Sequence, residues 1–236
     1  MNSMRFPRRL HSLLGLALVP VLLSGCFNPF SPEVLTKRVT VTAPQPNSPE
    51  EAVQLFEWCW VNRGVEEYKE LFTDDYVFQS ALLDSAGNGG RDVITRRSDE
   101  IETAENMFIG SADRPPAAKI TLNFDGSLRP QSDPRPNHPD SLYKTIRTSV
   151  DLKVDVEDGN VLEVTGHALF FLVRGDVALI PQELKSRIPP SRNRWWIERW
   201  EDETLPESGV TSGRARPMSA HWVMNIAQVK RYYLGR

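Results

Sequence analysis

The feature that most constrains the fold is a long stretch of alternating side chains in residues 145–157. Even positions from 146 to 156 carry Ile, Thr, Val or Leu, whereas odd positions from 147 to 157 carry Arg, Ser, Asp, Lys or Glu. Such a two-residue period is typical of a strand with one buried and one solvated face. Asp158-Gly159 follows, and this dipeptide is preferred in two-residue hairpin turns. We therefore expect a long antiparallel hairpin, with residues 161–173 as the return strand.

The register of this hairpin decides which side chains of the return strand face the interior. A two-residue turn at Asp158-Gly159 pairs Val156 with Val161. This register places three polar side chains on the apolar face: Glu163, Thr165 and His167. A bulge at Gly166 is the alternative, and it would reset the register. Reversal of the register would turn His167 toward water.

Helices are expected before the hairpin. Ser48-Pro49-Glu50-Glu51 combines a capping serine, a proline at the first helical position and the glutamate of a capping box. The apolar stripe that follows predicts a helix to Asn62, then a short helix at residues 65–72, a strand at 75–78, a loop at 84–90 and a third helix at 96–108. The clear two-residue period of residues 118–124 predicts another strand.

The chain after the hairpin is expected to end in a strand and a helix. Residues 194–200 form the last strand. Trp222, Ile226, Val229 and Tyr233 then recur at helical spacing, with Lys230 expected on the opposite, solvated side. Such a helix packs on the outside of the domain or, alternatively, docks on a membrane surface or a partner.

This order of elements predicts an α+β fold in which N-terminal helices pack on one face of a strongly curved antiparallel sheet. The order, the aromatic helix at residues 56–60 and the strands at 168–171 and 194–200 resemble the SnoaL-like superfamily, also called nuclear transport factor 2-like. The resemblance covers residues 48–203. It implies a cone-shaped cavity between sheet and helices, which members use as isomerases, dehydratases or cyclases, or for binding.

Within such a cone, Glu163, Thr165, His167 and Trp196 are the candidate ligand-binding residues. A histidine beside a carboxylate performs acid–base catalysis when burial moves both pKa values toward neutrality, so His167 and Glu163 are the catalytic candidates. The alternative is that His167 is a core side chain and that the tryptophans, Trp196 included, are core. No catalytic residue of the superfamily is carried over to this chain.

The N-terminus resembles the signal of a bacterial lipoprotein. Three arginines precede an apolar run too short to span a bilayer, and the run ends in Leu23-Ser24-Gly25-Cys26. The resemblance implies cleavage before Cys26, acylation of that residue and sorting to the outer membrane, facing the periplasm. We expect a signal peptide at residues 1–25, a tether at 26–47, the domain at 48–204, and a loop with a short helix at 205–236.

The net charge and the cysteine and histidine content argue against nucleic-acid binding and against a metal site. Removal of residues 1–25 takes away three arginines and no acid, which changes the formal net charge from −3 to −6 and disfavours nucleic-acid binding. Lipidation of Cys26 leaves Cys59 alone, as a buried apolar thiol. The histidines at 138, 167 and 221 lie on separate segments, so no metal site is expected, and no cofactor is indicated. A homodimer through the outer sheet face is left open.

The function expected from these observations is that of a lipid-anchored, non-enzymatic envelope protein that binds a small apolar ligand or an envelope protein. One alternative is an enzyme of the isomerase, dehydratase or cyclase type that uses His167 and Glu163. The other is a purely structural module whose cavity is filled by its own side chains.

Overall fold

The structure, a computed structural model, describes residues 42–83, 89–175, 177–204 and 221–235. These residues belong to one compact unit, Thr42–Arg236. The leader, Cys26 and the tether up to residue 41 lie outside the described residues, as do residues 205–220. Within the described ranges, no helix is both long and apolar enough to cross a membrane.

The first N-terminal helix begins and ends where its sequence signals predict. In α2 (Pro49–Asn62), Ser48 Oγ accepts a hydrogen bond from Glu51 N at 3.1 Å, and Arg63 ends the helix in the left-handed region. The helices α3 (Val65–Lys69) and α4 (Arg97–Phe108) follow, and α5 (Ile226–Leu234) comes last. Before α2, Pro46 O accepts a hydrogen bond from Trp195 N at 2.7 Å, which ties the entry of the chain to the sheet.

The strands form one sheet with the order β2-β1-β7-β6-β5-β3. Their bounds are β1 Phe72–Leu83, β2 Gly89–Arg96, β3 Lys119–Phe124, β5 Tyr143–Asp155, β6 Val161–Arg174 and β7 Trp195–Asp202. The short strands β4 (Gln131–Ser132) and β8 (His221–Val223) pair with β5 and β6. The pairs β1–β7 and β6–β8 are parallel, and the other pairs are antiparallel.

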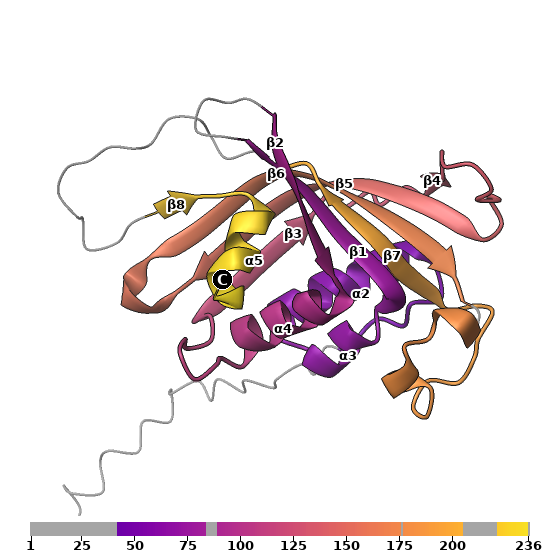
Figure 1. Ribbon diagram of the computed structural model, residues 1–236, viewed down its shortest axis with the longest axis horizontal. Coiled ribbons are helices and arrows are strands. Elements are labelled where there is room, and N and C mark those ends of the chain that lie inside the picture. The colour runs from indigo at the N-terminus through magenta and orange to yellow at the C-terminus, as the bar shows by residue number, and fades with distance from the viewer. Residues whose placement is uncertain (1–41, 84–88, 176, 205–220, 236) are drawn as a thin grey trace, which may run out of the picture. The chain divides into compact units, whose positions relative to one another are not determined.

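The helices α2, α3 and α4 lie along one face of this sheet, which curves around them (Figure 1). The predicted α+β architecture, with N-terminal helices on a curved sheet, is therefore confirmed. Two local predictions are wrong. Phe72 begins β1 instead of ending a helix, and Gly89–Arg96 forms the edge strand β2 where a loop and the start of a helix were expected.

The core lies between the sheet and the helices and is unusually aromatic. Its largest fully buried side chains include Trp60, Trp200, Tyr68, Phe56 and Phe170. The C-terminal helix α5 packs into this core and against α4. Ile226, Val229 and Tyr233 therefore face the interior, as the packing of this helix on the domain requires. Trp222, the fourth residue of the expected stripe, lies instead in β8 and is 39% exposed.

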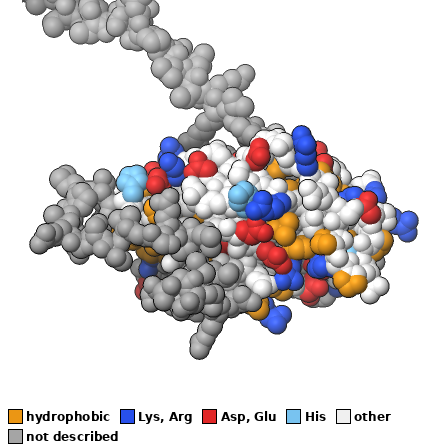
Figure 2. Space-filling model, turned by 90° about the horizontal axis from the view of Figure 1, so that it is seen from above, with side chains coloured by type: hydrophobic (Ala, Val, Ile, Leu, Met, Phe, Trp, Pro, Cys, Tyr) orange, Lys and Arg blue, Asp and Glu red, His pale blue; other side chains and the backbone are white. Residues whose placement is uncertain are grey.

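Two segments cover apolar residues on the opposite, outer face of the sheet. Residues 177–188 pack over Val173 and Trp196 in a second, smaller core. The loop around β4 places Arg135 over the Phe171 ring, with its guanidinium carbon 4.6 Å from the ring centroid. The rest of this face carries charges of both signs (Figure 2). They include the ion pairs Arg147–Glu203 and Lys153–Glu163.

Candidate functional site

The hairpin register differs by one residue from the predicted one, and this moves three of the candidate residues. The pairing is Asp155 with Val161, and Val156 N donates to Asn160 O at 2.9 Å. The loop thus has three residues and ends at Gly159, whose φ of 71° lies in the left-handed region. A three-residue loop of this type ends in such a glycine, whereas the expected turn has two residues.

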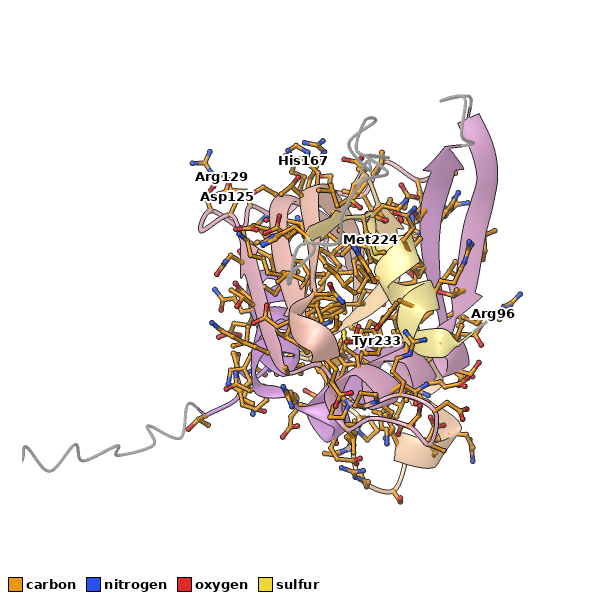
Figure 3. All side chains as sticks on the ribbon, turned by 90° about the vertical axis from the view of Figure 1, so that its left-hand side faces the viewer. Arg96, Asp125, Arg129, His167, Met224 and Tyr233 are labelled. Atoms are coloured by element: carbon orange, nitrogen blue, oxygen red, sulfur yellow. The ribbon has the colours of Figure 1, made fainter. Side chains whose placement is uncertain are left out.

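Because side chains alternate along a strand, this shift turns Glu163, Thr165 and His167 to the outer face. Thr165 and His167 are exposed. In Figure 3, His167 lies at the upper edge of the molecule, well away from Tyr233 in the helical layer. The expectation that these three residues line the interior of the cone is wrong.

Glu163 is engaged in ion pairs on that outer face. Its Oε1 atom lies 3.3 Å from Lys153 Nζ and 3.3 Å from His221 Nδ1. Burial raises the pKa of Glu163, but hydrogen bonds from these two partners outweigh it and hold the pKa below the usual value. A carboxyl group in this setting is ionised at neutral pH and is not poised to act as a general acid.

Trp196, the fourth candidate, is 1% exposed. It also lies on the outer face, under residues 177–188, and the Arg194 guanidinium carbon is 4.7 Å from its ring centroid. The structure therefore does not bring Trp196 together with Glu163, Thr165 or His167 in one interior cavity. Trp196 is therefore a core side chain, which was the alternative to its role in ligand binding.

Aromatic rings fill the interior of the cone. The ring of Phe56 lies 5.1 Å from that of Trp200, 5.3 Å from that of Phe170 and 5.4 Å from that of Tyr68, measured between centroids. Aromatic pairs at such separations are well packed. A gap of about 160 Å³ remains beside Phe56 and Trp200, and no water-sized sphere fits in it.

One cluster of ionisable groups lies within this aromatic interior. Glu100 of α4 accepts hydrogen bonds from Tyr68 Oη at 2.7 Å and from Tyr76 Oη at 3.1 Å, and it forms an ion pair with Lys230 of α5. Each of the four residues is at most 4% exposed. Burial, followed by the charge of Glu100, raises the pKa of both tyrosines, whereas burial lowers the pKa of Lys230 to about 8.

A second buried carboxylate lies near the same ammonium group. Asp202 accepts hydrogen bonds from Ser80 Oγ at 2.8 Å and from Thr204 N at 2.9 Å. Burial raises its pKa, against the effect of these bonds and of the Lys230 charge. Thr204 Oγ1 in turn accepts from Ile226 N at 3.1 Å, so this group also holds the first residue of α5.

The buried cluster was missed in the sequence because its charged members suggest a surface, although the periodicity places them inside. Glu100 precedes Ala104 by four residues, on the inward stripe of α4. Lys230 follows Ile226 by four residues and precedes Tyr233 by three, on the inward stripe of α5. The expectation that Lys230 lies on the solvated side of its helix is wrong, because a partner of opposite charge meets it in the core.

An open hollow of about 850 Å³ lies where β5 begins and β6 ends, away from the hairpin loop that joins the two strands. Its lining is partly apolar, with Leu142, Val173 and Leu179, and partly polar, with Arg192 and Asn193. Leu142 is 45% exposed.

No group of three or more His, Cys, Asp or Glu side chains is placed to hold a metal ion within the ranges that the structure describes.

Comparison with known proteins found similarity to solved structures. No protein-family model matches it, and no curated protein matches it. Similar solved structures include a conserved protein from Planctomyces limnophilus, which is 16% identical, with a TM-score of 0.42, covering 66% of this chain and 93% of that one.

Two further solved structures have the same TM-score of 0.42. A putative scytalone dehydratase from Novosphingobium aromaticivorans is 15% identical, and the match covers 71% of this chain and 92% of that one. A nuclear transport factor 2-like superfamily protein from Salmonella enterica serovar Typhimurium is 16% identical, and the match covers 70% of this chain and 93% of that one. At such identities a likeness concerns the fold alone.

Proposed function

We propose that this chain is a lipid-anchored protein of the outer membrane whose periplasm-facing domain binds another envelope protein and is not an enzyme. The observation that carries the proposal is the closed interior of the cone. Aromatic side chains fill it, and the gap beside Phe56 and Trp200 holds no water-sized sphere. A small apolar ligand therefore has no space there, and the buried acid–base groups have no substrate to meet.

The surface offers a binding site instead. The hollow beside Leu142 and Arg192 is open to solvent and combines apolar and polar lining, as the contact surfaces of protein partners do. The apolar residues Phe171 and Trp196 on the outer sheet face are already covered by the chain's own segments. This arrangement favours a partner at the hollow over a second copy of the chain at the sheet face.

The enzymatic alternative requires His167 and Glu163 inside the cone, and the observed register does not place them there. His167 is exposed on the outer face, and Glu163 is held there by Lys153 and His221. Neither lies in an enclosed cavity that would exclude water from a reaction. The purely structural module is left as an outcome of the binding experiment.

Binding at the hollow is tested with a photoreactive amino acid placed at Leu142 in the full-length chain, in its own membrane. The same residue at Ile109, which is 67% exposed and does not line the hollow, is the matched control. We expect one protein adduct from position 142 that is absent from position 109 and is lost with Arg192→Glu. Adducts that are the same at both positions, or no adduct, would contradict binding there and favour the structural module.

Anchoring is tested separately by membrane fractionation of Cys26→Ser. This variant is expected in the soluble periplasmic fraction, because acyl chains on Cys26 would supply the membrane affinity. Cys59→Ser, which changes the other cysteine of the chain, is expected to stay with the membrane. If Cys26→Ser also stays with the outer membrane, Cys26 is not the anchor.

A further inference from the structure

The Lys230 ammonium group occupies an enclosure that other elements build around it. Its Nζ lies 3.7 Å from the centroid of the Phe78 ring and 4.0 Å from that of Trp200, and it contacts the Glu100 carboxylate. The side chains of Lys230 and Glu100 are 5% and 1% exposed. Ring faces and a carboxylate are the groups that recognise an ammonium ion in proteins.

The parts of this enclosure are held in place by contacts that do not involve α5. Two tyrosine hydroxyls, from α3 and β1, fix the Glu100 carboxylate, one on each oxygen. Ser80 and the backbone of Thr204 fix Asp202. The groups that contact the Lys230 ammonium belong to β1, β7 and α4, whereas α5 contributes the cation and apolar side chains of the surrounding core. The Lys230 ammonium group thus lies among two rings and a carboxylate that other elements supply, as a bound cation lies among the groups of its binding site.

We propose that the interior of the cone is a binding site for a primary alkylammonium group, which Lys230 occupies in cis. The C-terminal helix then acts as a tethered ligand that fills the site and closes it. The ligand class follows from what Lys230 places there, which is an ammonium ion on an unbranched aliphatic stem among apolar side chains. This site is separate from the outer hollow and does not depend on binding there.

The experiment removes the tethered cation and supplies a free one. Lys230→Ala deletes three carbons and the ammonium nitrogen, and n-propylammonium has the same atoms. In the full mature chain, Lys230→Ala is expected to unfold at a lower temperature than the wild type. Propylammonium chloride is expected to raise this temperature by about 5–10 °C at about 100 times its dissociation constant, and the rise should grow with the logarithm of the concentration.

Matched controls separate this result from an effect of the salt or of the apolar stem. Lys230→Met keeps the site filled, so propylammonium should not stabilise it, nor the wild type. Propan-1-ol, which lacks the charge, should not stabilise Lys230→Ala. Glu100→Gln added to Lys230→Ala should abolish the stabilisation, because the carboxylate that recognises the cation is gone.

The proposal is overturned if propylammonium leaves Lys230→Ala unchanged, or if it stabilises Lys230→Met equally. If Lys230→Ala is recovered unfolded, its yield on refolding from denaturant is measured with and without propylammonium. A higher yield with propylammonium than with propan-1-ol supports the site. An equal or zero yield in both rejects it.

Discussion

Replacing Glu100 by glutamine removes the carboxylate that neutralises Lys230 in the core. The Glu100 oxygens also accept hydrogen bonds from Tyr68 at 2.7 Å and Tyr76 at 3.1 Å. A glutamine amide offers one accepting oxygen and one donating nitrogen, so at least one of the three donors loses its acceptor. Because the ammonium group is left buried and unpaired, we expect the free energy of unfolding to fall by about 3–5 kcal/mol.

The assay is urea unfolding at pH 7, followed by tryptophan fluorescence, for Glu100→Gln, Lys230→Met and the double variant. Removing both charges leaves no unpaired ion, so the double variant should lose about 0.5–3 kcal/mol less than the sum of the single losses. Additive losses, within about 0.5 kcal/mol, would show that the two charges do not meet in the interior. That result would also remove the basis for the alkylammonium site.

Further predictions concern single side chains. His167→Ala should change the free energy of unfolding by less than about 0.5 kcal/mol, since the ring is exposed, and a loss above about 2 kcal/mol would place it in the core. Phe56→Ala should cost about 3–5 kcal/mol in the same urea assay, whereas Val61→Ala, 46% exposed on the same helix, should cost far less. The Cys59 thiol, fully buried and with its pKa raised by burial, should react with a maleimide only after unfolding, and rapid labelling of the folded chain would contradict this. Burial lowers the pKa of Lys230 to about 8 from 10.5, so the unfolded state binds more protons between these values. The stability of the wild type relative to Lys230→Met should therefore rise from pH 8 to pH 10, and a constant difference would refute it.

Local signals in the sequence predicted most of the framework. The capping serine and the apolar stripe of α2 define a helix that the structure reproduces from Pro49 to Asn62. The alternation in residues 145–157 correctly identifies the buried face of β5. These signals work because they depend on neighbours within one turn or one strand. The edge strand β2 carries no such period, and its pairing with β1 is what defines it.

The hairpin register and the buried cluster needed information that local patterns do not contain. Asp158-Gly159 is compatible with a two-residue turn and with a three-residue loop ending at Gly159. The two connections differ by one residue in register, so they place opposite sets of side chains of the return strand on the buried face. The cluster joins Tyr68, Glu100 and Lys230, which are far apart in the chain. Lys230 was expected on the solvated side of its helix and Glu100 was not singled out, because the partner of each charge lies on another element and is not visible from either helix alone.

If the chain is held at its N-terminus, as in the proposed anchoring, the hydrogen bond between Trp195 N and Pro46 O determines where a pull enters the domain. Pro46 precedes the cap of α2, so a pull on the residues before Thr42 reaches this bond before it reaches the first helical turn. Trp195 begins β7, which lies between β1 and β6 in the sheet. The force is therefore shared with two neighbouring strands, and a chain held at its N-terminus strains the middle of the sheet instead of peeling off a helix.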